Sequence, residues 1–490
     1  MIKFNLYKEG GLKVHFVKKD DKLPEDIKEY LEKKKFSYKF KESLYLPSFL
    51  EESEIFMGLG EDELDLEDVR NLFFELGNIL RDNEEHEVEI KMPDLGMCNR
   101  KTIMAAYEGL RQGEYEFTKK TDVKEKKADF ELAVNYSAFK GPEEKLRAGL
   151  DKMENIMDGV FLARDLVNER ANVIYPESLA NIAVEKLEKL GVKVKVYEED
   201  EIEKIGMKAF LRVAAGATNR PRLIVMEYKN AEAEKIALVG KGLTYDSGGY
   251  NIKSPAGMNY MHCDMGGAGT VIGTIYALAK NKAKVNVVGV VAACENMISG
   301  TSYKSGDVID SMKGLTIEVA NTDAEGRITL ADAVHYATND LGAEKIIDLA
   351  TLTGAVTIAL GEVYTGAVTN NEDFYKEVLE AGKLSGEKMW AFPYDEDYKK
   401  LNKSEVADIK NTSGRDAGSV TAGLFVGEFV KEGTPWVHLD IAATAYRNKK
   451  SGYLPKNATG IHVKTLNNLL DPTDCWKFLN QNHWPRLVVF

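Results

Sequence analysis

A glycine-rich segment near the middle of the chain carries isolated charges in an otherwise apolar setting. It reads GKGLTYDSGGYNIKSPAGMNYMHCDMGG over residues 240–267. Its charged side chains are those of Lys241, Asp246, Lys253 and Asp264. Carboxylates and amines can ligate metals or stabilise an oxyanion. Alone, the segment is equally consistent with a structural turn from strand to helix, in which Gly248 and Gly249 provide backbone freedom.

A second charged cluster lies at residues 321–333, which read NTDAEGRITLADA. Asp323, Glu325 and Arg327 are spaced by two, so in an extended segment their side chains would point the same way. A helix is expected to begin near Thr329, which makes this a loop between a strand and a helix. Alone, the cluster could also be a set of surface charges near a helix N-terminus, where acidic residues are favoured.

Apolar runs alternate with helical patterns around these clusters. Strands are expected at 193–197, 222–228, 235–239, 284–292, 345–350 and 436–441. Helices are expected at 267–279, 330–338 and 419–430. This alternation predicts a largely parallel sheet with helices on both faces. Ligands of such sheets bind at the carboxyl ends of the strands, where both clusters and the segment TLTGA at 351–355 follow expected strands.

Four carboxylates would converge if these loops share one sheet edge. They are those of Asp246, Asp264, Asp323 and Glu325. Four carboxylates cannot all stay ionised in a dry cleft without cations, and divalent metals are the usual remedy. Oxygen-rich clusters suit hydrolytic sites with two metals about 3.5–4 Å apart. A lysine beside such a site could ligate a metal as the neutral amine or polarise a carbonyl as the ammonium.

The chain is expected to be an α/β protein of two domains, each a mostly parallel or mixed sheet flanked by helices. Residues 1–142 mix short strands with charged helices and contain no catalytic signature. After a break at Gly141 and Pro142, residues 143–168 follow a helical pattern that indicates a long linker helix. Residues 169–470 then form the catalytic domain, and 471–490 an atypical C-terminal tail.

Composition narrows the class of protein further. The 490 residues include 65 Lys and Arg against 78 Asp and Glu, a net charge of −13 that disfavours nucleic-acid binding. Four cysteines far apart exclude a disulfide scaffold and indicate reduced thiols. The N-terminus lacks a signal-peptide pattern, and no apolar run approaches the roughly 20 residues of a membrane span. A cytoplasmic protein is therefore expected.

Taken together, these motifs resemble the cytosolic leucine aminopeptidase family, the two-metal aminopeptidases. NTDAEGR followed by LADA matches the family signature, and VGKGLTYDSGG, DMGGA and TLTGA match at 239–249, 264–268 and 351–355. Further blocks match at 295–300 (ENMISG), 306–309 (GDVI) and 436–442 (WVHLDIA). The resemblance covers about residues 165–470 closely, and the N-terminal part only in the order of its elements.

The resemblance implies a role for each charged residue of the two clusters. Asp246 and Glu325 resemble carboxylates that bridge two metals. Lys241 and Asp264 resemble ligands of the more tightly bound metal, and Asp323 resembles a ligand of the more exchangeable one. By the same resemblance, a water that bridges the two ions attacks the peptide bond.

Two further residues resemble the catalytic pair of the family. Lys253 resembles the lysine that polarises the scissile carbonyl, and Arg327 the arginine that holds a bicarbonate ion as general base. Four positions match the lining of the pocket for the N-terminal side chain: Met261, Thr351, Ala442 and Ala445. Their resemblance implies a preference for Leu or Met at the peptide N-terminus.

The expected function is therefore hydrolysis of N-terminal residues from peptides. Its cofactors would be two divalent metals per subunit, Zn²⁺ or Mn²⁺ with Mg²⁺ or Co²⁺ as further options, and bicarbonate. The resemblance also implies a homohexamer. Two alternatives differ in class: a two-metal phosphoesterase, since carboxylate-rich metal pairs serve both reactions, and a DNA-binding regulator, which the negative charge disfavours.

Overall fold

The computed structural model describes residues 2–6, 9–47, 53–91, 95, 97–121, 131–136 and 142–471. The predicted tail beyond Asp471 and the predicted break at Gly141 lie outside these residues. The described chain forms two compact units. Unit 1 contains the described residues up to Met157 together with Lys450–Leu454, and unit 2 contains Asp158–Lys449 and the described residues from Pro455 onward.

Unit 1 is built on a six-stranded sheet with the order β1-β6-β5-β2-β4-β3. Its strands are β1 (Ile2–Leu6), β2 (Leu12–Val17), β3 (Ser43–Leu46), β4 (Glu54–Gly58), β5 (Glu87–Ile90) and β6 (Leu132–Tyr136). Its helices are α1 (Glu25–Lys33), α2 (Leu66–Asp82) and α3 (Asn99–Gln112). All neighbouring strands are parallel except β3 and β4. Asp65 caps α2, because its side chain accepts from the backbone N–H of Glu67 and Asp68.

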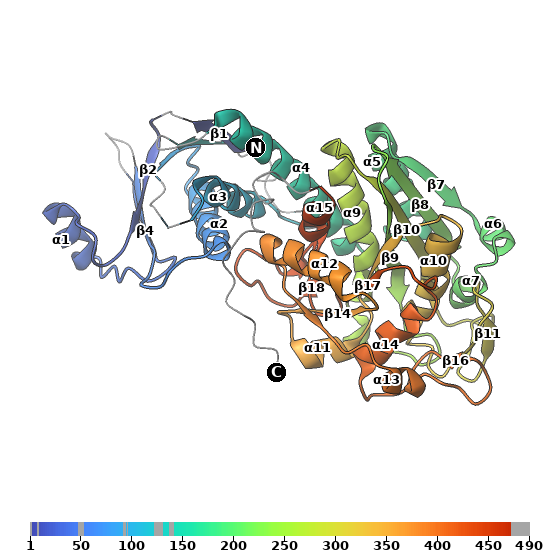
Figure 1. Cartoon of the computed structure of the whole chain (residues 1–490). Helices are drawn as coiled ribbons and strands as arrows, with labels where there is room; N and C mark the ends of the chain where they lie inside the picture. The colour runs from blue at the N-terminus through green and yellow to red at the C-terminus, as the bar shows by residue number, and fades with distance from the viewer. Residues whose placement is uncertain are drawn as a thin grey trace. The chain divides into compact units, whose positions relative to one another are not determined.

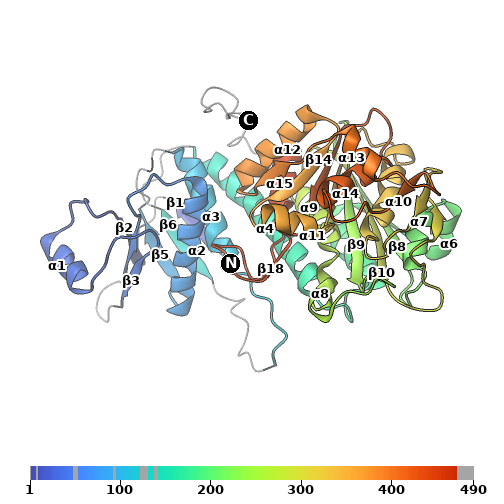
Figure 2. The same cartoon turned by 90° about the horizontal axis from the view of Figure 1, so that it is seen from below.

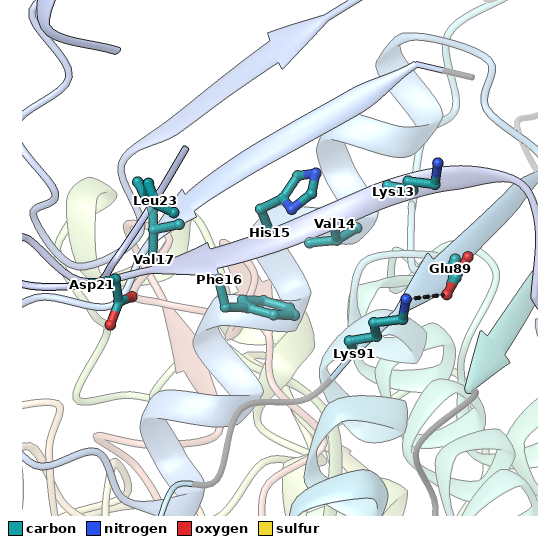
Figure 3. A pocket seen from close by; sticks show the side chains of 9 residues that line it. All are labelled: Lys13, Val14, His15, Phe16, Val17, Asp21, Leu23, Glu89 and Lys91. Carbon is teal, nitrogen blue, oxygen red and sulfur yellow. Dashed lines mark ion pairs between the residues drawn. The ribbon is translucent and has the colours of Figure 1, made fainter. Parts of the chain in front are cut away.

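A small pocket of about 230 Å³ lies against β2 of unit 1 (Figure 3). Lys91 Nζ pairs with Glu89 Oε1 at 3.2 Å in its lining (Figure 3). His15, also in the lining, stacks on Phe56 with ring centroids 4.6 Å apart. None of the predicted site residues lines this pocket.

The long helix α4 (Glu143–Asn168) follows unit 1 in the chain. Its helical pattern places Leu146, Leu150, Met153 and Ile156 in buried positions. The division between the two units falls within this helix, after Met157.

Unit 2 contains an eight-stranded sheet with the order β15-β14-β17-β13-β9-β10-β8-β7 (Figure 1). Its strands are β7 (Lys193–Tyr197), β8 (Arg222–Lys229), β9 (Lys235–Asp246), β10 (Asn286–Asn296), β13 (Lys345–Ala350), β14 (Thr365–Thr369), β15 (Met389–Ala391) and β17 (Trp436–Asp440). The central strands β17, β13, β9 and β10 are mutually parallel, and β8 and β14 join them antiparallel. The predicted α/β fold with a mixed sheet flanked by helices is confirmed.

Helices pack on both faces of this sheet (Figures 1 and 2). One buried core contains side chains from α5 (Pro176–Leu187), α9 (Gly266–Lys280), α12 (Glu372–Ser385) and α15 (Val463–Leu470). The other contains side chains from α7 (Lys208–Ala214), α10 (Gly326–Asn339) and α14 (Gly418–Gly427). The continuous Val and Ile runs of the central strands are buried because both faces are covered.

Short elements complete unit 2. The helices are α6 (Glu199–Lys204), α8 (Pro255–Met258), α11 (Gly354–Leu360) and α13 (Glu396–Leu401), with 3₁₀ turns η2 (Glu188–Leu190) and η3 (Met261–Cys263). The strands are β11 (Val308–Asp310), β12 (Thr316–Glu318), β16 (Ile409–Lys410), β18 (Tyr446–Arg447) and β19 (Asn457–Ala458). None of the described helices combines the length and the apolar character that a membrane crossing requires.

Candidate metal centre

The charged residues of the two sequence clusters meet at the carboxyl ends of the central strands. Lys241 and Asp246 lie on β9 itself, because this strand continues to Asp246 and does not end at Val239 as expected. Asp264 lies between η3 and α9, and Lys253 in the loop after β9. The expectation that ligands bind at the carboxyl ends of parallel strands therefore indicates the correct edge of the sheet.

The cluster at residues 321–333 adopts a different shape from the one expected. Asp323 lies in a turn, Glu325 is helical with φ −75° and ψ −34°, and Arg327 lies in the first turn of α10. The helix begins at Gly326, earlier than the expected start near Thr329. The spacing by two therefore does not reflect an extended segment, and the loop brings Asp323 and Glu325 to the site by turning.

A tight turn returns the chain after β9 so that Lys253 faces Asp246. The Lys253 backbone N–H donates to Ser247 O at 3.0 Å and closes the turn. Gly248 has φ +87°, and a Cβ there would come within 2.5 Å of Asn251 O and 2.9 Å of Asp323 Oδ1. The Gly248 N–H donates to Asp246 Oδ1 at 2.8 Å. The glycine is therefore needed both for its backbone angle and for the close approach.

Two lysine ammonium groups hold the carboxylates together. Lys241 Nζ lies 2.8 Å from Asp264 Oδ2 and 3.0 Å from Glu325 Oε1. Lys253 Nζ lies 2.8 Å from Asp246 Oδ2 and 2.6 Å from Asp323 Oδ1. The structure thus brings all five predicted metal ligands and Lys253 into one cluster.

Burial and mutual charge set the protonation of this cluster. Burial raises the pKa of Asp246, and the carboxylates of Glu325 and Asp264 raise it further. Burial acts to lower the pKa of Lys241, but the carboxylates of Asp264 and Glu325 outweigh it and raise the pKa. Burial acts to raise the pKa of Glu325, but the two ammonium groups outweigh it and lower the pKa. The carboxylates therefore depend on nearby cations to remain charged.

The donor set fits divalent cations. One carboxylate oxygen from each of Asp246, Asp323 and Glu325 lies within 4.8 Å of the others. Glu325 Oε2 is buried and accepts no hydrogen bond among the described residues. A buried charged oxygen without a donor is costly unless a cation satisfies it. Carboxylate oxygens with one amine nitrogen suit Mn²⁺, Zn²⁺ and Mg²⁺.

Comparison with known proteins decides the family. The sequence profile described as the cytosol aminopeptidase family, catalytic domain, matches residues 161–467. The chain belongs to the cytosol aminopeptidase family. The matched range contains every residue of the cluster, and the predicted resemblance is confirmed.

Relatives in this family match nearly the whole chain. A protein of Treponema denticola named "Probable cytosol aminopeptidase" is 53% identical over 471 residues, which are 95% of this chain and 98% of the relative. One of the same name from Clostridium tetani is 46% identical over 95% of this chain and 98% of its own length. Membership of the cytosol aminopeptidase family supports metal-dependent aminopeptidase activity.

Solved structures agree with the family and the fold. A mutant of tomato leucine aminopeptidase superposes with a TM-score of 0.86 at 33% identity, covering 96% of each chain. The bottromycin maturation enzyme BotP in complex with Mn superposes with a TM-score of 0.85 at 27% identity, covering 94% of this chain and 98% of that one.

The predicted catalytic arginine lies in the first turn of α10, where the aminopeptidase chain buries all but 7% of its surface. Arg327 Nη1 donates to Asn411 O at 2.9 Å. Its Nε is buried and has no hydrogen-bond partner among the described residues. Burial lowers the pKa of Arg327 to about 10, so the guanidinium stays charged at neutral pH.

Two of the four predicted pocket residues lie close together in the structure. A Cβ on Gly266 would meet Thr351 Cγ2 and Ala445 Cβ at 3.2 Å each, so these two side chains flank the start of α9. Met261 lies half-buried on η3, and Ala442 follows β17, where its N–H donates to Asp440 Oδ1.

Sequence reasoning missed Asn296 and predicted only a pocket role for Thr351, whereas both residues hold ligands of this aminopeptidase in place. Asn296 Nδ2 donates to Asp246 Oδ1 at 2.8 Å and to Thr322 O at 2.9 Å. Thr351 Oγ1 donates to Asp264 Oδ1 at 2.7 Å, and its carbonyl accepts from Lys241 Nζ at 3.1 Å. The signal for Asn296 was present, because it lies in the ENMISG block at the end of an expected strand.

Proposed function

We propose that this aminopeptidase removes Leu- or Met-like N-terminal residues from peptides with two divalent metals, Zn²⁺ or Mn²⁺, and with bicarbonate as general base; Mg²⁺ and Co²⁺ are further options. One observation carries the proposal. Four buried or half-buried carboxylates and two lysines converge within ion-pair distance at the carboxyl ends of the sheet, in a chain of the cytosol aminopeptidase family.

Five residues would hold the two metals. Asp246 and Glu325 would bridge them, Lys241 and Asp264 would complete the tighter site, and Asp323 the more exchangeable one. The Asp323 side chain is 32% exposed, against 6% or less for the other ligands, which supports its assignment to the more exchangeable metal. When bound, the metals supply Lewis acidity and lower the pKa of a water molecule toward neutrality.

Lys253 would stabilise charge on the substrate. Burial acts to lower its pKa, but the carboxylates of Asp246 and Glu325 outweigh it and raise the pKa, so Nζ keeps its proton. The side chain is 18% exposed, which lets the ammonium meet a bound peptide. Donation from Nζ to the scissile carbonyl oxygen would strengthen as negative charge develops there.

Arg327 would hold the bicarbonate. The guanidinium presents N–H groups in a planar fork that matches a planar oxyanion in two places at once. Its Nε, which has no hydrogen-bond partner in the described part of the chain, and its charge at neutral pH support this role. The anion so held would accept the proton that leaves the attacking water.

The side-chain pocket would select the residue that is removed. Thr351 and Ala445 approach each other beside Gly266, and Ala442 is equally small. Small side chains leave room for an unbranched or γ-branched apolar residue, and Met261 would provide an adaptable apolar contact. This supports a preference for Leu and Met.

The proposal extends to assembly and organisation. We propose a cytoplasmic homohexamer in which residues 169–470 carry the chemistry, residues 1–142 form a separate domain and 143–168 link the two. Light scattering on the purified chain tests the assembly, because a hexamer of 54.6 kDa subunits is readily distinguished from smaller oligomers.

An activity profile over aminoacyl amides tests the function. The chain is assayed after EDTA treatment and after addition of Zn²⁺, Mn²⁺ or Co²⁺, with N-acetyl-leucyl amide as the blocked control. We expect activity on leucyl and methionyl amides that EDTA abolishes and metal restores, and none on the blocked substrate. Hydrolysis of phosphate esters in place of amides would overturn the proposal in favour of a phosphoesterase.

A further inference from the structure

The loop after β13 is held by a residue of β17 that lies outside the predicted site. In the parallel β13–β17 pair, Asp348 is in register with His438 and Ala350 with Asp440. Asp440 is therefore level with the end of β13, where the chain leaves the sheet as residues 351–353. Among the described residues, its side-chain hydrogen bonds go to this loop and to its own turn.

Asp440 accepts four hydrogen bonds from neutral donors. Its Oδ1 accepts from the N–H of Leu352 at 3.2 Å, of Thr353 at 3.4 Å and of Ala442 at 3.2 Å. Its Oδ2 accepts from Thr353 Oγ1 at 2.6 Å. The residue is 1% exposed, and its charge also interacts with those of His438 and Arg327. A buried carboxylate directed at two consecutive backbone N–H groups fixes the course of the backbone.

The other end of the same loop touches the metal centre. The Thr351 carbonyl accepts from Lys241 Nζ at 3.1 Å, and its hydroxyl donates to Asp264 Oδ1 at 2.7 Å. These two contacts act on both proposed ligands of the tighter metal. The residue that orients the ligands and the residues that Asp440 holds are thus consecutive in the chain.

We propose that Asp440 is a positioning residue of the metal centre: it holds Leu352 and Thr353 so that Thr351 orients Lys241 and Asp264. The inference rests on the proposed function, because it takes these two residues as ligands. Partners that orient ligands in this way typically account for 10–100-fold in metal affinity or activity.

Asp348 provides a matched control on the same two strands. It is fully buried, and its carboxylate accepts from Trp436 Nε1 and pairs with His438 Nδ1, both at 2.6 Å. Among the described residues, its side-chain hydrogen bonds go to β17 and not to the loop at 351–353. Loss of Asp348 therefore disturbs the β13–β17 pair without removing the loop contacts.

The experiment compares Asp440→Ala, Asp440→Asn and Asp348→Ala by Mn²⁺ titration calorimetry, thermal unfolding and kcat and KM on leucyl amide. We expect Asp440→Ala to weaken Mn²⁺ binding about 10–100-fold. Asp440→Asn should retain most of the wild-type Mn²⁺ affinity, because Asn keeps an oxygen that accepts from the three backbone donors. Asp348→Ala should lower the unfolding temperature and leave Mn²⁺ affinity within about threefold of wild type, well below that loss.

Two results overturn the inference: wild-type Mn²⁺ affinity in folded Asp440→Ala, or an equal loss in Asp348→Ala. If Asp440→Ala does not fold, Thr353→Val removes the donor to Oδ2 together with the acceptor for the Val356 N–H that caps α11. Ser419→Ala controls for the neighbouring hydroxyl 2.8 Å from Thr353 Oγ1. In that case, a wild-type Mn²⁺ affinity of Thr353→Val would overturn the inference. Failure of the wild-type chain to bind Mn²⁺ would refute the proposed function instead, so the two failures are distinguishable.

Discussion

Replacement of Lys253 by methionine should change turnover and metal affinity in opposite directions. In the structure, Nζ of Lys253 lies 2.8 Å from Asp246 Oδ2 and 2.6 Å from Asp323 Oδ1, two of the proposed metal ligands. A metal must displace this ammonium group before it can use both carboxylates. Methionine keeps the length and apolar stem of the side chain and removes the charge.

The expected magnitudes follow from these contacts. Loss of a donor to a developing oxyanion lowers kcat by about 10²–10³-fold, or roughly 2.7–4 kcal/mol. Coulomb's law at an effective dielectric constant of about 20 gives roughly 6 kcal/mol for unit charges at this separation. Solvent screens most of this for a partly exposed lysine, but a residual of about 1.4 kcal/mol would already tighten Mn²⁺ binding tenfold.

The assay measures leucyl amide hydrolysis at saturating Mn²⁺ and Mn²⁺ affinity by calorimetry on the same protein. Lys376→Met is the matched control, because this lysine is 65% exposed on α12 and pairs only with the neighbouring Asp373. Near-wild-type turnover in Lys253→Met would refute the assigned role. Weakened Mn²⁺ binding would refute the competition between ammonium and metal.

Three further predictions concern stability. Gly267→Ala should lower the free energy of unfolding by about 3 kcal/mol or more, because its Cβ would lie 2.0 Å from Leu349 O. At the control position Gly300 a Cβ meets no atom, so Gly300→Ala should change the free energy of unfolding in urea by less than about 0.5 kcal/mol. Burial and the charge of Lys464 lower the pKa of His462 to about 3. Between this value and the unfolded pKa of 6.5 only the unfolded chain binds the proton, so the free energy of unfolding decreases as the pH is lowered. In denaturant titrations, His462→Asn should therefore lose about 2 kcal/mol less stability than the wild type between pH 7 and pH 5. Removal of metal by EDTA should lower the calorimetric unfolding temperature, because metal at about 100 times its Kd stabilises by about 2.7 kcal/mol.

The sheet of unit 2 was largely predictable because its strands are continuous apolar runs. The predicted ends of Lys193–Tyr197 and Lys345–Ala350 agree with β7 and β13. The predicted end of β9 at Val239 was wrong, because the strand continues through Gly240 and Gly242 to Asp246. In the structure a Cβ on Gly240 would come within 2.6 Å of Gly267 O, so the glycine marks the close crossing of α9 and not the end of the strand.

The composition of the site was predictable, but its local geometry was not. Glycines followed by isolated charges after apolar strands indicate a site at the sheet edge, and the structure gathers these charges there. The spacing of Asp323, Glu325 and Arg327 carried no information on the turn that the loop makes. Asp440 lies in the matched WVHLDIA block, but its contact with the loop at 351–353 arises from the register between β13 and β17, which no local pattern encodes.

The charge balance of the site explains why its carboxylates tolerate burial. Asp246, Asp264, Asp323 and Glu325 face the ammonium groups of two lysines and the guanidinium of one arginine, which leaves a single negative charge when all are ionised. Under the proposed function, two divalent cations would add four positive charges to this nearly neutral cluster. Release of the Lys241 proton and binding of an anion at Arg327 both reduce that excess. Metal affinity should therefore rise with pH and with bicarbonate concentration, as a direct consequence of the charge balance among these side chains.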